Sequence, residues 1–379
     1  MIRVSRCAMT LVVLTILLLS MSSPTLGQLP ATRLDGLFPT GGQMGQTVDV
    51  TIIGADLDDV DQLMFSDKGI TAKTKMAEAT AFDEKPLPIE NQFVISIAAD
   101  VQPGLYEVRC RGKYGLSGPR KFAVSTTVAT LEVEPNNDVA SSTLLPSIPG
   151  EMFGQLNGAA DVDWIRFQGS AGQRIVIDCM AQRLDSPADA VLSLYNSTGD
   201  LLFESRQGIT GDALIDARLP VDGEYLVQIQ EELFRGGANY VYRLVLGAAP
   251  IIDSVFPPAG AAGSNDEYTI YGRNLPGGTP AAVFRYGQEL EQLKVRIPIP
   301  SDIEDKLIFS DALSPHRAGL DGVEFKIDGP HGTSNPILVT VTSAPSVLEQ
   351  ADNNTPETAQ RLTIPCEVMG QFFPQRDAD

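Results

Sequence analysis

The sequence has 379 residues, of which 48 are acidic and 28 basic, so its formal net charge at neutral pH is −20. Such a chain is a poor partner for nucleic acid and anionic lipid, because binding either requires a basic surface. Beyond residue 27 the cysteines are Cys110, Cys179 and Cys366, which are too few and too far apart for a disulfide framework. Cys110 and Cys179 alternate with apolar residues, so both are expected to be small buried side chains.

Residues 1–27 have the pattern of a secretory signal peptide. Two arginines precede an apolar run from Ala8 to Leu19, and small and polar residues lead to an expected cleavage point after Gly27. The run is shorter than a typical membrane span, and an uncleaved N-terminal anchor is the alternative. No other stretch is long and apolar enough to span a membrane, so we expect the mature chain to be secreted: extracellular, periplasmic or at the cell surface.

The chain repeats itself. The stretch LDGLFPTGGQMGQTVDVTIIGADL at 34–57 is matched without a gap by IDSVFPPAGAAGSNDEYTIYGRNL at 252–275. Further along, LEVEPNND at 131–138 has a partner in LEQADNNT at 348–355. Self-similarity at a fixed period indicates tandem modules. The last copy stops at Asp379, early in its module, so we expect the complete protein to continue.

The predicted secondary structure is β throughout. TVDVTIIG at 47–54 alternates apolar with polar residues, and RIVIDCM at 174–180 and GEYLVQIQ at 223–230 have the length and composition of strands. Glycine, proline, asparagine and aspartate separate these runs at a spacing typical of β-sandwiches. The fold class predicted is all-β, as tandem sandwiches that each have their own core.

The repeat at 34–57 resembles the start of an IPT/TIG domain, an immunoglobulin-like sandwich. The resemblance is carried by Asp35 and its partner Asp253, by the FPTGG and FPPAG turns, and by strands that end in IIGADL and IYGRNL. It covers 33–125 and 250–343. It implies modules that serve as spacers or as protein contacts.

The stretch 130–247 resembles a bacterial pre-peptidase C-terminal (PPC) domain, a jelly-roll-like β-sandwich attached to secreted proteases and other exported proteins. Its marks, in order, are EVEPNND, GQL, DVDWIRF, GQRIVIDC, AVLSLYNSTGD and DGEYLVQIQ. The truncated start of a second PPC-like domain spans 347–379. The resemblance implies that the acidic opening segment and the aspartate before the aromatic strand bind calcium.

The candidate metal ligands are all oxygen donors. In an extended segment residues i and i+2 point the same way, so Glu132 and Glu134 can face one point, and so can Asp161 and Asp163. If the sandwich places these two pairs side by side, an oxygen cage suited to calcium results. Zinc is disfavoured, since no histidine or cysteine is nearby. The candidate ligands are Glu132, Glu134, Asn137, Asp138, Asp161 and Asp163.

The same segment also fits a simple turn, because asparagine and aspartate after a proline commonly bond backbone groups through their side chains. The sequence leaves the cage and the turn both open. The second copy has a weaker claim to a metal: it keeps Glu349, Asn354, Asp377 and Asp379, has Ala351 and Thr355 where Glu134 and Asp138 stand, and adds Asp352.

No catalytic residues and no organic cofactor are expected. The only histidines are His316 and His331, and His331 aligns with Tyr114 of the first repeat, which predicts a loop. The sequence has no nucleophile elbow, paired-histidine metal motif, phosphate loop or dinucleotide fingerprint. The single tryptophan, Trp164, points away from Asp163 along its strand and is expected in the core. An exposed Trp164 would instead indicate a binding platform.

The sequence therefore predicts a secreted, non-catalytic, multi-module protein for extracellular adhesion, targeting or spacing, with a calcium-stabilised PPC-like module. Its expected partner is an extracellular protein or polysaccharide; neither the ligand nor the oligomeric state follows from the sequence. The alternative is the accessory region of a secreted hydrolase, a protease above all, whose catalytic domain lies beyond Asp379. A carbohydrate-binding module is a third interpretation.

Overall fold

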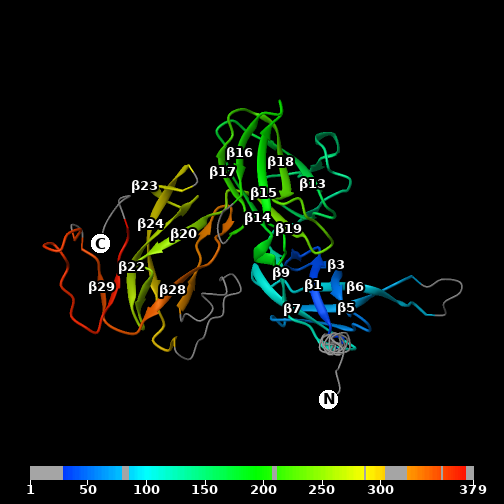
Figure 1. Cartoon of the computed structure of the whole chain (residues 1–379), viewed down its shortest axis with the longest axis horizontal. Coiled ribbons are helices and arrows are strands. Elements are labelled where there is room, and N and C mark those ends of the chain that lie inside the picture. Colours follow the sequence, from blue (N-terminus) through cyan, green and yellow to red (C-terminus); the bar gives the residue numbers. More distant parts are fainter. Residues whose placement is uncertain are drawn as a thin grey trace, which may run out of the picture. The chain divides into compact units, whose positions relative to one another are not determined.

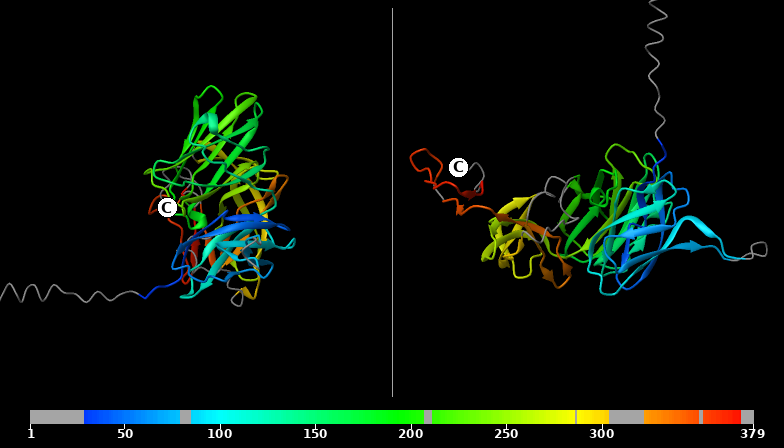
Figure 2. Two further views of the ribbon diagram at one scale, coloured as in Figure 1. Left: turned by 90° about the vertical axis from the view of Figure 1, so that its right-hand side faces the viewer. Right: turned by 90° about the horizontal axis from the view of Figure 1, so that it is seen from below.

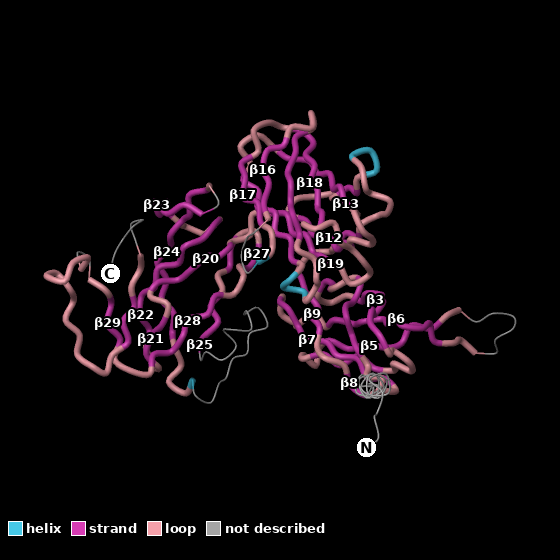
Figure 3. Tube along the Cα trace, viewed as in Figure 1, coloured by secondary structure: helices cyan, strands magenta, loops and turns pink. Residues whose placement is uncertain are grey.

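The computed structural model describes residues 29–78, 85–206, 211–285, 287–303, 322–350 and 353–372. Strands dominate these residues (Figures 1 and 3), which confirms the all-β fold class. No helix among them is long and apolar enough to cross a membrane. The chain divides into the units Met1–Ala31 and Thr32–Asp379, and all the strands below belong to the second. Outside the described residues lie the predicted signal peptide, His316, Asp352, Asp377 and Asp379.

The first group of strands forms a two-sheet sandwich. Its strands are β1 (Arg33–Phe38), β2 (Gly41–Gln43), β3 (Thr47–Ala55), β4 (Gln62–Phe65), β5 (Ile70–Met76), β6 (Pro88–Ile97), β7 (Gly104–Gly112), β8 (Gly115–Leu116) and β9 (Arg120–Ser125). One sheet has the order β1-β3-β6-β5 and the other β2-β9-β7-β4. Val50 and Ile52 of β3 are buried, as the alternation predicted, and Cys110 is buried with them. Figure 2 shows that the β5–β6 hairpin extends beyond the rest of this sandwich.

The second group has ten strands in two five-stranded sheets among the residues described between 130 and 247. The strands are β10 (Thr130–Leu131), β11 (Thr143–Leu144), β12 (Gly150–Gln155), β13 (Val162–Gly169), β14 (Arg174–Met180), β15 (Ala190–Asn196), β16 (Leu201–Ser205), β17 (Leu214–Arg218), β18 (Gly223–Glu231) and β19 (Val241–Gly247). Their orders are β10-β12-β19-β14-β17 and β11-β13-β18-β15-β16. Two short 3-10 helices, Val139–Ser141 and Gln182–Leu184, lie in the connections.

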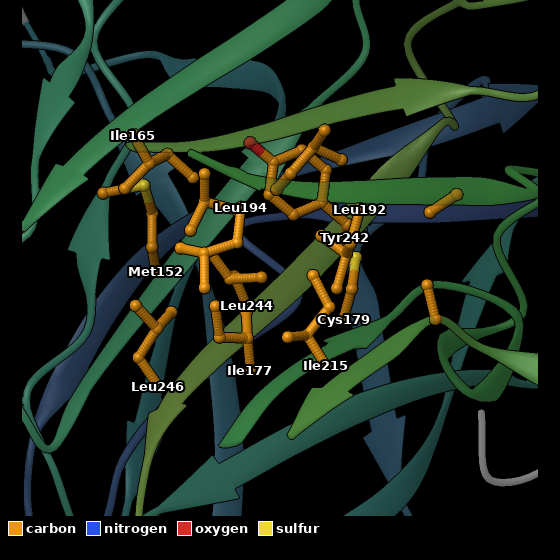
Figure 4. Close-up of a cluster of buried hydrophobic side chains, with 14 of the residues drawn as sticks. Met152, Ile165, Ile177, Cys179, Leu192, Leu194, Ile215, Tyr242, Leu244 and Leu246 are labelled. Atoms are coloured by element: carbon orange, nitrogen blue, oxygen red, sulfur yellow. The ribbon is translucent and has the colours of Figure 1, made fainter. Parts of the chain in front are cut away.

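The core of the second sandwich lies between its two sheets, and strand pairing decides which side chains face it. Leu192 and Leu194 from β15 meet Leu244 from β19 between the sheets (Figure 4), and Cys179 is buried beside them. Strand pairing antiparallel to β18 fixes the register of β13, so its side chains alternate between the core and the outer face.

The alternation along β13 is the feature that places the candidate site. Asp163, Ile165 and Phe167 are all fully buried on the core side of the strand. Trp164 therefore points to the opposite face, where it is half-buried. The expectation that Trp164 lies in the core is wrong, because the carboxylate of Asp163 occupies the inward position.

The third group repeats the first. Its strands are β20 (Ile251–Phe256), β21 (Ala259–Ala261), β22 (Asn265–Arg273), β23 (Thr279–Arg285), β24 (Gln288–Pro298), β25 (Gly322–Phe325), β26 (Asp328–Gly329), β27 (Gly332–Thr333) and β28 (Ile337–Thr342). β20 pairs with β22 with a register shift after Ile252, just as β1 pairs with β3 with a shift after Leu34. A Cβ on Gly54 would collide with the carbonyl oxygen of Arg33 in the first copy, which explains the glycine at this point of both repeats.

The last described strands, β29 (Ser346–Leu348) and β30 (Glu367–Met369), pair in parallel. This is the arrangement of β10 and β12 at the start of the second sandwich. The sequence repeat at 131–138 and 348–355 is thus matched by a repeated strand pairing.

Replacing Leu192 with alanine is expected to destabilise the second sandwich by roughly 2–5 kcal/mol, because the side chain is fully buried and leaves a cavity. Chemical denaturation of the full chain measures the loss. Leu201→Ala on the neighbouring strand β16 is the matched control: Leu201 is 51% exposed, and its truncation should change stability by less than about 0.5 kcal/mol. Equal effects of the two changes would contradict the assigned core.

Candidate metal centre

Three chain segments meet at one end of the second sandwich. The first is the acidic segment after β10, which continues the parallel pairing with β12 through a hydrogen bond from the Glu132 N–H to the Phe153 carbonyl (3.0 Å). The second is the loop 157–161 that precedes β13, and the third is the start of β13 itself. The meeting of the two acidic stretches is the juxtaposition on which the cage interpretation depended.

Glu134, Asp161 and Asp163 form the cluster. One carboxylate oxygen from each lies within 4.8 Å of the other two. The three side chains lie at different depths: Glu134 is exposed, Asp161 is 8% exposed, and Asp163 is fully buried. A group of oxygen donors that is open at one side and buried at the other suits a hard cation that enters from solvent.

Backbone and amide donors hold two of these carboxylates in place. Asp161 accepts hydrogen bonds from the N–H groups of Asn157 (2.6 Å) and Val162 (3.1 Å), and from the side-chain nitrogen of Asn137 (3.0 Å). Glu134 accepts from the Asn136 N–H (2.9 Å) and from the Asn157 side chain (3.2 Å). These hydrogen bonds fix the orientation of the two carboxylates.

Asp163 is the most deeply buried carboxylate of the cluster. Its Oδ2 atom is buried and has no hydrogen-bond partner, and a buried polar atom left without a partner is costly. Burial above all raises the pKa of Asp163 to about 7; the nearby Tyr242 hydroxyl opposes this rise, and the charges of Asp161 and Glu134 add to it. A bound cation would satisfy this oxygen and favour the ionised carboxylate.

Glu132 lies behind the cluster. It accepts hydrogen bonds from the Gln155 N–H (2.7 Å) and the Tyr242 hydroxyl (3.1 Å). Burial and the charge of Asp163 raise the pKa of Glu132 to about 9, against the hydrogen bonds from Tyr242 and Gln155, which lower it. Among the described residues it is not part of the close three-carboxylate group. Glu132 therefore lies next to the three-carboxylate group and interacts electrostatically with Asp163.

Asn136 belongs to the site although the sequence analysis did not select it. It is fully buried, and its side-chain amide lies 3.0 Å from both Asp163 Oδ1 and Glu134 Oε2. With its nitrogen toward these carboxylates Asn136 donates to both. With its oxygen toward them it adds a fourth oxygen to the group, which is the donor type that calcium takes from amides.

The other two candidates have local roles. The side-chain nitrogen of Asn137 donates to Asp161, so this residue supports a cluster carboxylate. Asp138 is exposed and caps the 3-10 helix Val139–Ser141, accepting from both the N–H and the hydroxyl of Ser141 at 2.9 Å. Asp138 thus makes the turn contact that aspartate commonly makes after a proline.

The second copy reproduces the contact that Glu132 makes in the first. Glu349 accepts from the Gln371 N–H at 2.7 Å, the same distance that joins Glu132 to Gln155. The acids that would correspond to the rest of the cage lie outside the described residues. His331, predicted in a loop, is exposed in the turn between β26 and β27.

No family model and no curated protein matches this chain. Among solved structures, the pre-peptidase C-terminal domain of a Bacillus anthracis collagenase is similar at 13% identity, covering 28% of this chain and 93% of that one, with a TM-score of 0.23. The Bacteroides ovatus glucan-utilisation protein SGBP-B, solved with a mixed-linkage heptasaccharide, matches at 11% identity over 58% of this chain and 76% of its own, with a TM-score of 0.19. The Aeromonas hydrophila lysozyme inhibitor PliG matches at 15% identity over 27% and 96%, with a TM-score of 0.20. No functional conclusion rests on likenesses this distant.

In the presence of a chelator, the stability of the second sandwich is expected to fall as the pH rises from about 4 to about 9. The folded-state pKa values of Asp163 and Glu132 are raised, so the folded protein binds more protons than the unfolded chain over this range. Calorimetric melting across this pH range measures the effect. The transition of the second sandwich is identified as the one that Leu192→Ala shifts to lower temperature. Asp163→Asn should flatten the dependence, and a wild-type transition that is level or rises with pH would contradict the assigned burial.

Proposed function

We propose that this chain is a secreted, non-catalytic, multi-module protein of alternating TIG-like and PPC-like sandwiches for extracellular adhesion, targeting or spacing. In this proposal the module 130–247 is stabilised by calcium. The observation that carries it is the buried Oδ2 of Asp163, which lacks a partner within a group of converging oxygens.

The donor set fits calcium better than other common ions. Calcium accepts six to eight oxygen ligands in flexible geometry, whereas magnesium demands near-ideal octahedral geometry and gives up its water reluctantly. Glu134, Asp161 and Asp163 would supply carboxylate oxygens. Asn136, whose amide nitrogen otherwise donates to Glu134 and Asp163, would supply an amide oxygen by turning its amide over. The exposed side of Glu134 leaves room for water ligands. Zinc sites in proteins usually include histidine nitrogen or cysteine sulfur, which these residues do not provide.

Bound calcium would neutralise charge that the sandwich otherwise holds at a cost. The three carboxylates repel one another, and burial adds to the cost of ionising Asp163. The ligands come from the acidic segment after β10, from the loop before β13 and from β13. An ion held by all three would therefore fasten the start of the module to its core strands.

The surface chemistry supports an extracellular role with protein or neutral polysaccharide partners. The net charge of −20 works against nucleic acid and acidic polymers, and favours cations. The signal-peptide pattern supports secretion, and the repeated sandwiches suit a protein that spaces or presents binding surfaces. The absence of catalytic motifs from the sequence supports a non-catalytic role.

Calcium is expected to raise the melting temperature of the second sandwich in the full chain relative to chelator. The free energy of unfolding should increase by about 2.7 kcal/mol when free calcium is roughly a hundred times the dissociation constant, because only the folded state binds calcium. Glu134→Gln and Asp163→Asn together should abolish it.

Glu224→Gln is the matched control, since Glu224 is an exposed acid of the same sandwich outside the cluster. It should leave the calcium effect intact. A wild-type melting temperature that is the same in calcium and in chelator would refute the calcium proposal.

A further inference from the structure

The outer face of the sheet β11-β13-β18-β15-β16 carries an aromatic and amide surface. It consists of Trp164 from β13, Gln228 and Gln230 from β18, and Tyr195 from β15, and we call these four residues the Trp164 platform. Trp164 lies directly across from Gln228 in the strand register, and Tyr195 lies one strand further on. All four side chains are half-buried, so each is fixed by the sheet and still reaches solvent.

The two rings of the platform are held at a defined angle. Their centroids are 5.2 Å apart with an interplanar angle of 43°. The Tyr195 hydroxyl donates to Gln228 Oε1 at 3.1 Å, which anchors the ring to the strand between them. The result is a bent apolar surface, with amide groups beside it.

The platform is uncharged within a strongly acidic chain. None of its four residues is ionised at neutral pH, and the charged residues that share this face of the sheet, Arg166, Glu204 and Glu224, carry both signs. The chain as a whole has a charge of −20. An acidic polymer would be repelled by that charge, and a basic one would find no carboxylate on the platform itself. The platform therefore matches an uncharged ligand.

Neutral sugars have the chemistry that such a surface recognises. The C–H faces of a pyranose ring pack on aromatic rings, which provide large contact area with a polar edge. Neighbouring sugar hydroxyls both donate and accept hydrogen bonds, as glutamine amides do. Two rings set at an angle can contact successive sugar units of a twisted chain.

We propose that the Trp164 platform binds a neutral polysaccharide. This rests on the proposed role of the chain as a binding module, and it names the ligand class. The binding surface lies on the opposite side of β13 from Asp163, so the strand presents the platform outward and the candidate metal ligand inward. The backbone N–H of Trp164 also donates to the backbone carbonyl of Asn136 at 2.9 Å, which connects β13 to the acidic segment.

The test uses the only tryptophan of the chain as its own reporter. The full chain, in calcium, is titrated with a mixed-linkage β-glucan, a xylan and a galactomannan, with alginate as the acidic polymer and gelatin as the peptide polymer. Intrinsic fluorescence should change on saturable binding of at least one neutral polysaccharide. Affinity electrophoresis in the same polymers gives an independent readout.

Variants separate the platform from other surfaces. Tyr195→Ala and Gln228→Ala keep the reporter and should each weaken binding about tenfold or more, while Tyr195→Phe keeps the ring and should retain most of it. Trp164→Ala should abolish retardation in the gel. Phe284→Ala, at an aromatic side chain that is 69% exposed in the third sandwich, is the control and should bind normally. Unchanged melting of each variant shows that it is folded.

Several results would overturn the proposal. These are the absence of binding to all three neutral polysaccharides, binding that the platform variants leave unchanged, or Trp164-dependent binding of gelatin or alginate alone. The calcium proposal is tested separately by melting. If calcium stabilises the chain but no polysaccharide binds, the polysaccharide proposal is refuted and the calcium proposal is not.

Discussion

The second sandwich depends on a carboxylate placed where its strand faces the core. Asp163 is fully buried, in line with Ile165 and Phe167, and one of its oxygens has no hydrogen-bond partner. Isolated buried charge is expensive, so a sandwich that keeps this residue must either protonate it or give it a counter-charge. The raised pKa of Asp163 corresponds to the first solution. In the proposed calcium state the second would apply, with the oxygens of Glu134 and Asp161 holding the cation beside Asp163.

This constraint links the opening segment of the module to its core. A segment of two glutamates, a proline and two asparagines has little apolar surface to bury, so packing alone gives it no reason to adopt one position. Here it is held by directional bonds: Glu132 to Gln155 and Tyr242, and Glu134 to Asn157. In the proposed calcium state Glu134 would also connect the segment to β13 through the ion.

Strand periodicity allowed much of this to be predicted. A period of two placed Asp161 and Asp163 on one side of β13, and the structure brings Glu134 beside them. Periodicity could not say which asparagine of the pair turns inward, since that depends on the path of the turn, and Asn136 was missed for this reason. It also could not tell which face of β13 is the core, so Trp164 was placed inside. In both cases the tertiary packing decided the outcome.

The most direct measurement of the central claim is isothermal titration of calcium into the chelator-stripped full chain, in two buffers with different ionisation heats. Saturable binding, with a heat that depends on the buffer because protons leave the raised-pKa carboxyls, is the predicted result. Asp163→Asn should remove that binding. The absence of binding heat in both buffers, or binding that Asp163→Asn leaves unchanged, would contradict the account. The acidic segment would then be only a turn.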